Sequence, residues 1–235
     1  LYEILYFACK SKKNYGSQRS KVYKVRKEEK FTGANHFFLC VLYKPCSFAG
    51  RCNSLLFMDT LAQYQAAIAG CKDIFIKKTK DYGTSWRVLR PISVVDQIFI
   101  KAQRIRNIQE LGTQKIADDI EGEFKGIVNY GVIGLIQLEQ PGNPYADLPV
   151  EEVERLYTSH ITAVQEVMLA KHHDYGEAWR DMSQESFTDL ILTKLQRIRQ
   201  ILRNQGKTLI SEGIDANYVD IINYALFALI KISER

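Results

Sequence analysis

The chain has 235 residues, and its 32 lysines and arginines outnumber its 27 acidic residues, which gives a formal net charge of +5. The excess lies in residues 1–57, with 11 basic and 3 acidic residues, so the remainder carries a net charge of −3. Because nucleic-acid-binding domains present clustered positive charge, we expect no direct nucleic-acid binding by residues 58–235. The sequence has no Gly-rich phosphate loop, nucleophile elbow or His-Glu-x-x-His zinc helix, which excludes those enzyme classes.

Residues 1–57 form a basic N-terminal extension without a counterpart later in the chain. We interpret it as a poorly ordered extension, or as translated upstream sequence before a start at Met58, rather than as a domain. Its apolar run at residues 36–43 is too short to span a bilayer and lies too far from the terminus for a secretory signal. Its cysteines are spaced too widely for a structural zinc pair. Deletion of this segment is expected to leave the fold intact.

The rest of the chain contains two copies of one unit. Residues 80–106 match residues 173–199 at a constant offset of 93, and a further shared block follows at an offset of 94. Such a period defines the structural unit before any secondary structure is assigned. The segment between the copies, residues 141–148, begins with turn-forming Pro, Gly and Asn. We therefore predict repeat 1 at residues 58–140 and repeat 2 at residues 149–235, joined by this linker.

Each repeat is predicted to contain three helices. The first segments, at residues 60–80 and 149–172, are amphipathic, and Pro149 suits a first helical turn. The middle segments carry apolar residues at helical spacing in both copies. The third segment of repeat 2 has a broad apolar face that must be buried. The predicted fold class is all-α: two pseudo-symmetric three-helix repeats forming one helical bundle, packed through their third segments.

An Asp-Tyr-Gly motif ends the first segment of each repeat, and a Trp-Arg pair follows it. Gly83 and Gly176 suit the left-handed conformation of a helix C-cap, and the tryptophans suit core anchors of the next loop. An aspartate at a helix C-terminus opposes the helix dipole, so it needs a cation as partner. The candidate ligand-binding residues of this motif are Asp81, Tyr82, Trp86, Asp174, Tyr175, Trp179 and Arg180.

Lys101 and Lys194 lie inside the apolar stripe of the middle segments, with Arg104 and Arg197 one turn later. Buried cations require partners. The partner is either an acidic side chain of the motif or third segment, or the phosphate of a ligand, for which arginine offers a planar fork and lysine a point charge. Both interpretations remain open. The acidic candidates on the third segments are Glu121, Glu123, Asp215 and Asp220.

Asn129 and Asn223 lie in apolar runs of the third segments, each followed by a tyrosine. A buried amide must satisfy its donors and acceptor. It does so either through a polar contact between helices or through a ligand. We therefore include both asparagines among the candidate ligand-binding residues.

These motifs resemble the nucleotide modification associated domain, type 1, a helical family long described as a domain of unknown function. Repeat 2 carries the resemblance most fully, in His172-His173-Asp174-Tyr175-Gly176 and Asp220-Ile221-Ile222-Asn223-Tyr224, whereas repeat 1 has Gly126 in place of Asp220. The resemblance covers residues 58–235. It implies a helical fold and an association with nucleotide and DNA base modification, with no assured reaction.

The chain is also distantly similar to the all-α nucleotide pyrophosphatases of the MazG type. Those enzymes hold Mg²⁺ through acidic residues on two helices, because Mg²⁺ takes oxygen ligands and shares them with substrate phosphates. Neither of their metal motifs is intact here, which puts hydrolysis in doubt. By this resemblance the cofactor would be Mg²⁺, and its candidate ligands are Asp174, Asp215 and Asp220.

Two hypotheses of function follow. The first is a protein that handles a nucleotide or phosphate ligand, Mg²⁺-dependent in one form and, if an enzyme, similar to a nucleotide pyrophosphohydrolase. The second is a non-catalytic helical binding or assembly module, whose charged motif is a structural salt-bridge network. Solvent access discriminates between them, because a binding site lines a cleft and a structural network is closed.

Localisation and partners are constrained only by composition. The repeats contain a single cysteine, Cys71, which is typical of a reducing compartment. We therefore expect a cytoplasmic protein whose partner is a nucleotide or another phosphorylated small molecule. No membrane partner is expected, and a homodimer is compatible with the sequence.

Overall fold

The computed structural model describes residues 47–117, 119–139, 142–143 and 145–234, with side-chain surroundings from residue 59 onward. The chain divides into two compact units, Leu1–Cys52 and Asn53–Arg235. Most of the N-terminal extension expected at residues 1–57 lies outside the described residues. All that follows concerns the unit Asn53–Arg235.

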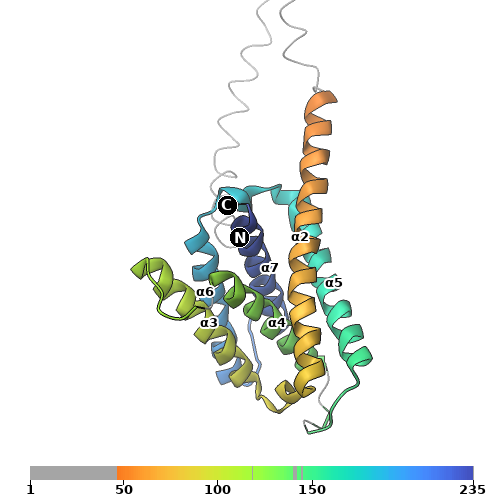
Figure 1. Cartoon of the computed structure of the whole chain (residues 1–235), viewed down its shortest axis with the longest axis vertical. Helices are drawn as coiled ribbons and strands as arrows, with labels where there is room; N and C mark the ends of the chain where they lie inside the picture. Colours follow the sequence, from red (N-terminus) through yellow and green to blue (C-terminus); the bar gives the residue numbers. More distant parts are fainter. Residues whose placement is uncertain (1–46, 118, 140–141, 144, 235) are drawn as a thin grey trace, which may run out of the picture. The chain divides into compact units, whose positions relative to one another are not determined.

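The described residues are helical and contain no strand, which confirms the predicted all-α class (Figure 1). Helices α3 and α6 begin where local chemistry favours a start: Pro91 is the first residue of α3, and the Ser183 hydroxyl accepts a hydrogen bond from the Ser186 N–H at the N-terminus of α6. The helices are α2 (Ser47–Tyr82), α3 (Pro91–Leu111), α4 (Ile120–Glu139), α5 (Val150–Tyr175), α6 (Gln184–Arg203) and α7 (Ile214–Ser233), with short 3-10 helices η1 (Ser85–Val88) and η2 (Ala178–Asp181).

The order of elements repeats. Helices α2, η1, α3 and α4 form repeat 1, and α5, η2, α6 and α7 form repeat 2. The glycines that end α2 and α5 have positive φ in both copies, 64° at Gly83 and 59° at Gly176, a conformation that only glycine adopts readily. Gly176 departs from the predicted left-handed cap, because its ψ is −141°. Helix α2 begins at Ser47, ahead of Met58.

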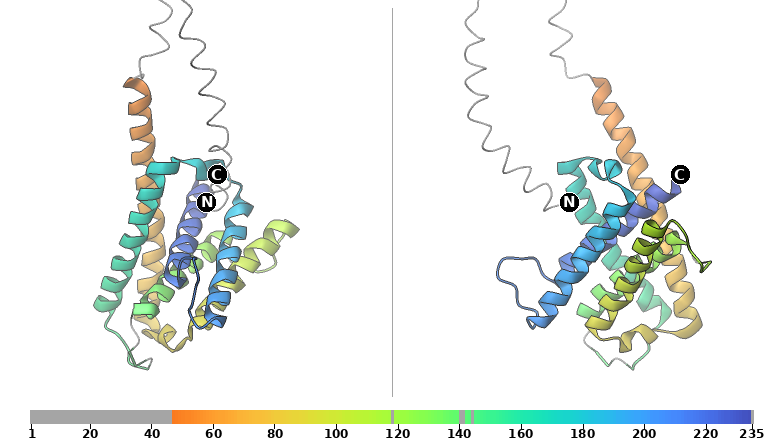
Figure 2. Two further views of the ribbon diagram at one scale, coloured as in Figure 1. Left: turned by 180° about the vertical axis from the view of Figure 1, so that it is seen from behind. Right: turned by 90° about the vertical axis from the view of Figure 1, so that its left-hand side faces the viewer.

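The two repeats make reciprocal hydrogen bonds with each other. The Tyr64 hydroxyl on α2 donates a hydrogen bond to Asn223 Oδ1 on α7 (2.6 Å), and the Tyr157 hydroxyl on α5 donates one to Asn129 Oδ1 on α4 (3.0 Å). The first helix of each repeat thus contacts the third helix of the other. Helices α2 and α5 also lie side by side (Figures 1 and 2), where Lys72 Nζ is 2.8 Å from a Glu154 carboxylate oxygen. Reciprocal contacts of this kind indicate an approximate two-fold relation between the repeats.

The middle helices, α3 and α6, form reciprocal ion pairs in the same way. The Arg199 guanidinium on α6 lies 2.7 Å from Asp96 on α3, and Arg106 on α3 lies 3.8 Å from Asp189 on α6. These four residues are the equivalent aspartate and the equivalent last arginine of the two middle segments, at the offset of 93. Their role in the described structure is therefore to join the two repeats.

Helices α4 and α7 pack closely at the centre of the core. A Cβ atom at Gly131 would lie 2.6 Å from the Ile222 side chain, and one at Gly134 would lie 2.5 Å from the Tyr218 ring. Because real Cβ contacts are longer, only glycine permits this approach. The predicted packing through the third segments is thus seen in the fold.

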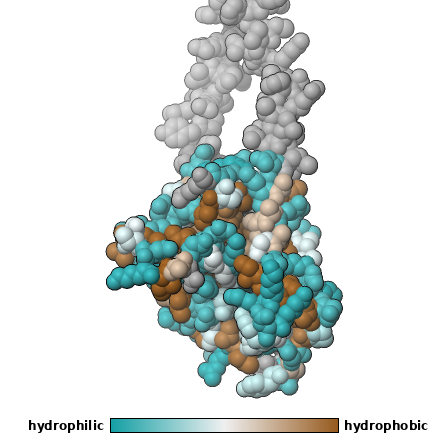
Figure 3. All heavy atoms as spheres, in the orientation of Figure 1, coloured by the Kyte–Doolittle hydropathy of each residue, from teal (hydrophilic) through white to brown (hydrophobic). Residues whose placement is uncertain are grey.

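The surface mixes residue types. Figure 3 shows hydrophilic and hydrophobic residues interspersed over the described part of one face. Within the described residues, no helix combines the length and the hydropathy needed to cross a membrane.

Candidate functional site

A cavity of about 410 Å³ lies within repeat 1, between α2, η1, α3 and α4. Its lining includes three lysines but no aspartate or glutamate. Aromatic rings form much of the remaining wall, together with two amide side chains. The lining residues used below are Phe75, Lys78, Tyr82, Trp86, Gln97, Lys101, Lys125, Gly126, Asn129 and Ile133.

The three lysines differ in their partners. Lys101 Nζ is 3.0 Å from Glu123 Oε2, and the same carboxylate also accepts a hydrogen bond from Arg104. Lys125 Nζ is 2.6 Å from Glu121 one turn earlier, and that hydrogen bond raises the lysine's pKa. Lys78 is exposed and forms no ion pair with a described acidic residue. The cavity therefore has a cation whose charge the described protein does not offset.

The aromatic wall comes from the segment around the Asp-Tyr-Gly motif. Trp86, on η1, lies at 6.4 Å between ring centroids from Phe75, and it is only partly buried. Tyr82, the last residue of α2, is 58% exposed. A flat ligand ring therefore has aromatic surface to pack against.

The corresponding place in repeat 2 is closed. Asp220 lies between two lysines, with Lys194 Nζ 2.7 Å from one carboxylate oxygen and Lys171 Nζ 2.5 Å from the other. The side chains of Lys194 and Asp220 are 8% and 6% exposed. Burial raises the pKa of Asp220, but the hydrogen bonds and charges of the two lysines outweigh burial and hold this pKa below its usual value. Asp220 is thus a charged, internally paired carboxylate.

The tryptophan of repeat 2 is also covered by the protein itself. Trp179 stacks on Phe227 with ring centroids 4.6 Å apart and an interplanar angle of 8°, and the Arg180 guanidinium carbon lies 4.3 Å from the Trp179 ring centroid. Trp179 is 3% exposed as a result. The Arg87 counterpart of Arg180 instead donates a hydrogen bond to the Ala146 carbonyl.

The predicted site residues fall into three groups. Lys101, Tyr82, Trp86 and Asn129 come together at the cavity of repeat 1, and Arg104 reaches Glu123 behind it. Asn129 donates from Nδ2 to the Cys71 carbonyl (3.0 Å), so its amide is already satisfied by the protein. The remaining predicted residues lie elsewhere: Asp81, Asp174, Tyr175, Trp179, Arg180, Lys194, Arg197 and Asn223.

Those remaining residues have mainly protein partners. Arg180 pairs with Glu177 and Glu234, and Asn223 accepts from Tyr64 as described above. Asp81 and Asp174 are exposed at the ends of α2 and α5. Neither aspartate contacts the lysine of the following helix, whose partners are Glu123 and Asp220.

The three candidate magnesium ligands do not converge. Asp174 is exposed and lies 3.0 Å from His173 Nδ1, Asp215 is exposed in the first turn of α7, and Asp220 is held by its two lysines. Among the residues that the structure describes, no three His, Cys, Asp or Glu side chains are grouped as metal ligands. The donor set of the repeat 1 cavity, cations and amides, does not fit a hard cation such as Mg²⁺.

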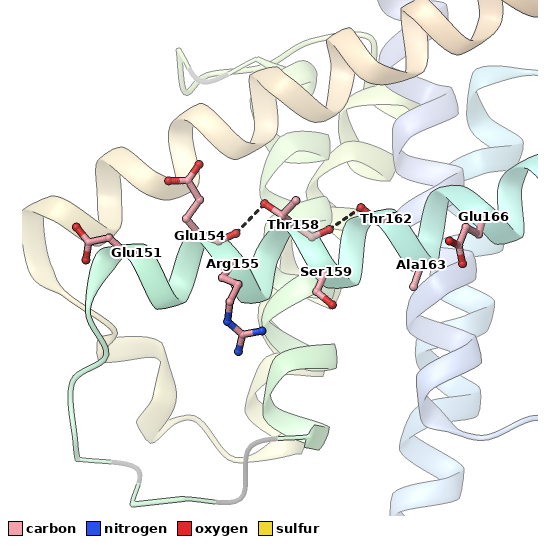
Figure 4. Close-up of a pocket in the computed structure, with 8 residues that line it drawn as sticks. All are labelled: Glu151, Glu154, Arg155, Thr158, Ser159, Thr162, Ala163 and Glu166. Atoms are coloured by element: carbon pink, nitrogen blue, oxygen red, sulfur yellow. Dashed lines mark hydrogen bonds between the residues drawn. The ribbon is translucent and has the colours of Figure 1, made fainter.

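Two further hollows lack the features of a binding site. One, on the outer side of α5, is lined by side chains of that helix alone (Figure 4), among them Glu151, Glu154 and Glu166, with Arg155 paired to Glu152. The other, between α3 and α6, is lined by the ion pair of Asp96 and Arg199. Neither joins unpaired cations to an aromatic surface.

Sequence reasoning missed Lys78 and Lys125. Lys78 had a detectable signal, because it corresponds to Lys171 at the same offset of 93 that defines the repeat. Lys125 had none, because repeat 2 has Val219 in its place.

The fold and the cavity define an all-α protein of two tandem three-helix units, one with an open basic cavity and one closed. Two segments, residues 78–138 and 171–232, match the family model described as nucleotide modification associated domain 1, and together they cover more than half of the chain. The chain therefore belongs to this family, with a copy in each repeat. No curated protein and no solved structure matches the chain.

Proposed function

We propose that repeat 1 binds a nucleotide or another phosphorylated small molecule in its cavity, and that the protein serves nucleotide or DNA base modification through this binding. The observation that carries the proposal is a cavity lined by three lysines and several aromatic rings, with no acidic residue in its lining. The family description, nucleotide modification associated domain, supports the same direction.

Electrostatics favours an anionic ligand. A lysine binds phosphate as a compact point charge with three donors, and hydrogen bonds between charged groups are the stronger ones. Lys78 offers such a charge without a described acidic partner, and Lys101 is 27% exposed beside it in the cavity lining. The aromatic side chains supply a stacking surface, and each stacked base contributes about 1–3 kcal/mol in known nucleic-acid complexes.

Any Mg²⁺ requirement would come from the ligand, because the lining of this cavity has no carboxylate to hold the metal. Mg²⁺ commonly keeps several waters and is held largely by substrate phosphates rather than by a protein cage. The cavity offers protonated lysines, which cannot ligate a cation, so the protein itself contributes no metal ligand here. A hydrolytic reaction has no assigned base or nucleophile here, and the proposal is limited to binding.

The alternative function, a structural salt-bridge network, is favoured in repeat 2 by the buried pair of Asp220 and Lys194, which the partly exposed Lys171 joins. The charges of this network are satisfied by the protein itself, and its central pair is shielded from solvent. The two hypotheses therefore apply to different halves of the same molecule.

A thermal-shift screen of the full chain tests the proposal. Nucleoside mono-, di- and triphosphates are added with and without Mg²⁺, and binding to the folded state raises the melting temperature. The matched variants are Lys78→Ala, in the cavity, and Lys77→Ala, whose side chain is 72% exposed and pairs with Asp73. We expect Lys78→Ala to lose the shift and Lys77→Ala to keep it. Absence of any nucleotide-dependent shift in the unaltered chain, or equal loss in both variants, contradicts the proposal.

A further inference from the structure

Two substitutions between the repeats open the cavity of repeat 1. At the offset of 94 that relates α4 to α7, Gly126 stands in place of Asp220, and Ile133 stands in place of Phe227. The groups around them are retained, because Lys78, Lys101 and Trp86 correspond to Lys171, Lys194 and Trp179 at the offset of 93. Repeat 1 thus has the residues that surround the Asp220 carboxylate and the Phe227 ring in repeat 2, but it has neither the carboxylate nor the ring.

The acidic group has moved by one helical turn. In repeat 2 the carboxylate of Asp220 neutralises both lysines. In repeat 1 the acid is Glu123, whose counterpart is Asn217, and it pairs with Lys101 and Arg104 instead. Lys78, the counterpart of Lys171, is left on the cavity wall without a carboxylate. An anion near Gly126 would restore the arrangement that repeat 2 completes internally.

The ring position has changed in the same way. In repeat 2 the Phe227 ring lies parallel to Trp179 at 4.6 Å between centroids. In repeat 1 the corresponding residue is Ile133, a smaller side chain without a ring, which lines the cavity together with Trp86. No described aromatic ring is stacked flat on Trp86, because its neighbour Phe75 is tilted by 38°. A planar ligand ring of aromatic character would occupy the place that Phe227 takes.

We infer that the ligand of repeat 1 takes the positions that Asp220 and Phe227 occupy in repeat 2. Its anionic group lies between Lys78 and Lys101 over Gly126, and its flat ring lies against Trp86 next to Ile133. The inference rests on the proposed function and specifies its substrate class as a nucleoside monophosphate. Asp220 and Phe227 are seven residues apart, which places them on one face of α7 and about 10 Å apart along its axis. The ligand therefore lies along α4, with its phosphate nearer the start of that helix and its base nearer the end.

An aspartate at position 126 requires only the Lys101 side chain to move. A Cβ atom there would lie 2.8 Å from Lys101 Cε, at the far end of a flexible side chain rather than against backbone. Lys101 can move and pair with the new carboxylate, as Lys194 does with Asp220. Gly126→Asp is thus expected to close the anion position without unfolding the chain.

Isothermal titration of the full chain with AMP, GMP, CMP and UMP tests the inference. Gly126→Asp should weaken binding at least tenfold by placing a negative charge in the anion position, whereas Gly126→Asn, of equal size and no charge, should weaken it less. Ile133→Phe should weaken binding at least tenfold by filling the ring position, whereas Ile133→Leu, which adds no ring, should weaken it less. Far-ultraviolet circular dichroism and melting temperatures verify that each variant is folded.

The outcomes separate the two levels of the proposal. If no nucleotide of the broader thermal screen binds the unaltered chain, the proposed function fails and the inference falls with it. If monophosphates bind the unaltered chain but Gly126→Asp and Ile133→Phe bind them equally well, only the inference fails. If Gly126→Asp does not fold, Lys78→Glu replaces it. Residue 78 is exposed, and this substitution reverses the charge in the same anion site. Unchanged binding by Lys78→Glu then overturns the inference.

Discussion

At the scale of single residues, the lysines at positions 101 and 194 show how one motif serves two purposes. Their helices and neighbours correspond, yet the side chain of Lys194 is 8% exposed and that of Lys101 is 27% exposed. The difference follows from the acid that each one meets. Asp220 is buried with Lys194, while Glu123 lies behind Lys101 and leaves it at the cavity wall.

Lys194→Met should destabilise the fold by about 3 kcal/mol, since removing one partner of a buried pair leaves a poorly compensated charge. The value lies at the low end of the usual range because Lys171 still pairs with Asp220. The matched change Lys101→Met should cost less than about 1 kcal/mol, because the site is partly exposed and Glu123 keeps Arg104. Urea denaturation of the two variants measures both values. Equal losses would show that the two lysines are energetically alike.

Asp220 should also make stability depend on acid pH. Its pKa is below the usual value in the folded state, so its stabilising contribution is complete above about pH 4, the ordinary pKa of aspartate, and is lost as the pH falls through the folded pKa. Asp220→Asn should therefore be less stable than the unaltered chain at pH 7, with a smaller difference at pH 3. Burial lowers the pKa of His160, which adds its own acid sensitivity below about pH 6.5. Only the difference between the two chains isolates Asp220, and a difference independent of pH would contradict its role.

At the scale of helices, sequence periodicity was sufficient for the fold class, because the apolar faces of both repeats recur at helical spacing and have to be buried together. The positive φ of the glycines that end α2 and α5 followed from turn chemistry in the same way. The exchange of Tyr64 and Tyr157 between repeats could not be predicted from periodicity, since spacing within a helix does not say which neighbouring helix a polar tip will reach. The two tyrosines are related by the offset of 93, and this correspondence was the only sequence indication that they play equivalent roles.

The candidate site was predictable only in part. The motif indicated Lys101, Tyr82, Trp86 and Asn129, which the structure brings to one cavity. The replacement of Asp220 by Gly126 is visible in the sequence, but its effect depends on which acid each lysine pairs with, and that is set by side-chain packing across three helices. Asn129 and Asn223 illustrate the limit, because a buried asparagine within an apolar run is equally compatible with a ligand and with a helix contact.

The inter-repeat tyrosine bonds should differ in their energetic value. Tyr64→Phe leaves Asn223 without its acceptor bond, and Asn223 Nδ2 already has no partner among the described residues. Tyr157→Phe leaves Asn129 with its bond to the Cys71 carbonyl. Because unsatisfied buried polar groups cost about 1–3 kcal/mol, we expect Tyr64→Phe to be the more destabilising change. Thermal denaturation of both variants compares them, and a larger loss for Tyr157→Phe would contradict the described contacts.

At the scale of the whole molecule, the two repeats combine a common framework with different interiors. The ion pairs between α3 and α6 and the close approach of α4 and α7 hold the repeats together. Repeat 2 fills its interior with its own carboxylate and ring, and repeat 1 has a cavity at the corresponding place. The binding proposed above therefore concerns repeat 1 of the described residues, and not repeat 2.

The compact unit Asn53–Arg235 should fold by itself. A chain beginning at Asn53 is expected to melt within a few degrees of the full chain, because the core described here is formed by side chains from Tyr64 onward. A cut at residue 57 instead shortens α2 further into this unit. Differential scanning calorimetry of the full and shortened chains makes the comparison. A large drop in melting temperature for the chain from Asn53 would show that preceding residues contribute to the core.

The chain has two tryptophans, Trp86 at the open cavity and Trp179 in the closed copy, so their indole N–H signals report separately on the two repeats. Two-dimensional ¹⁵N–¹H NMR of the full chain during a titration with AMP, with the signals assigned through Trp179→Phe, is the most direct measurement of this difference. We expect the Trp86 signal to shift in a saturable manner while the Trp179 signal stays in place. Saturable shifts of both signals, a shift of Trp179 alone, or no shift of either would contradict it.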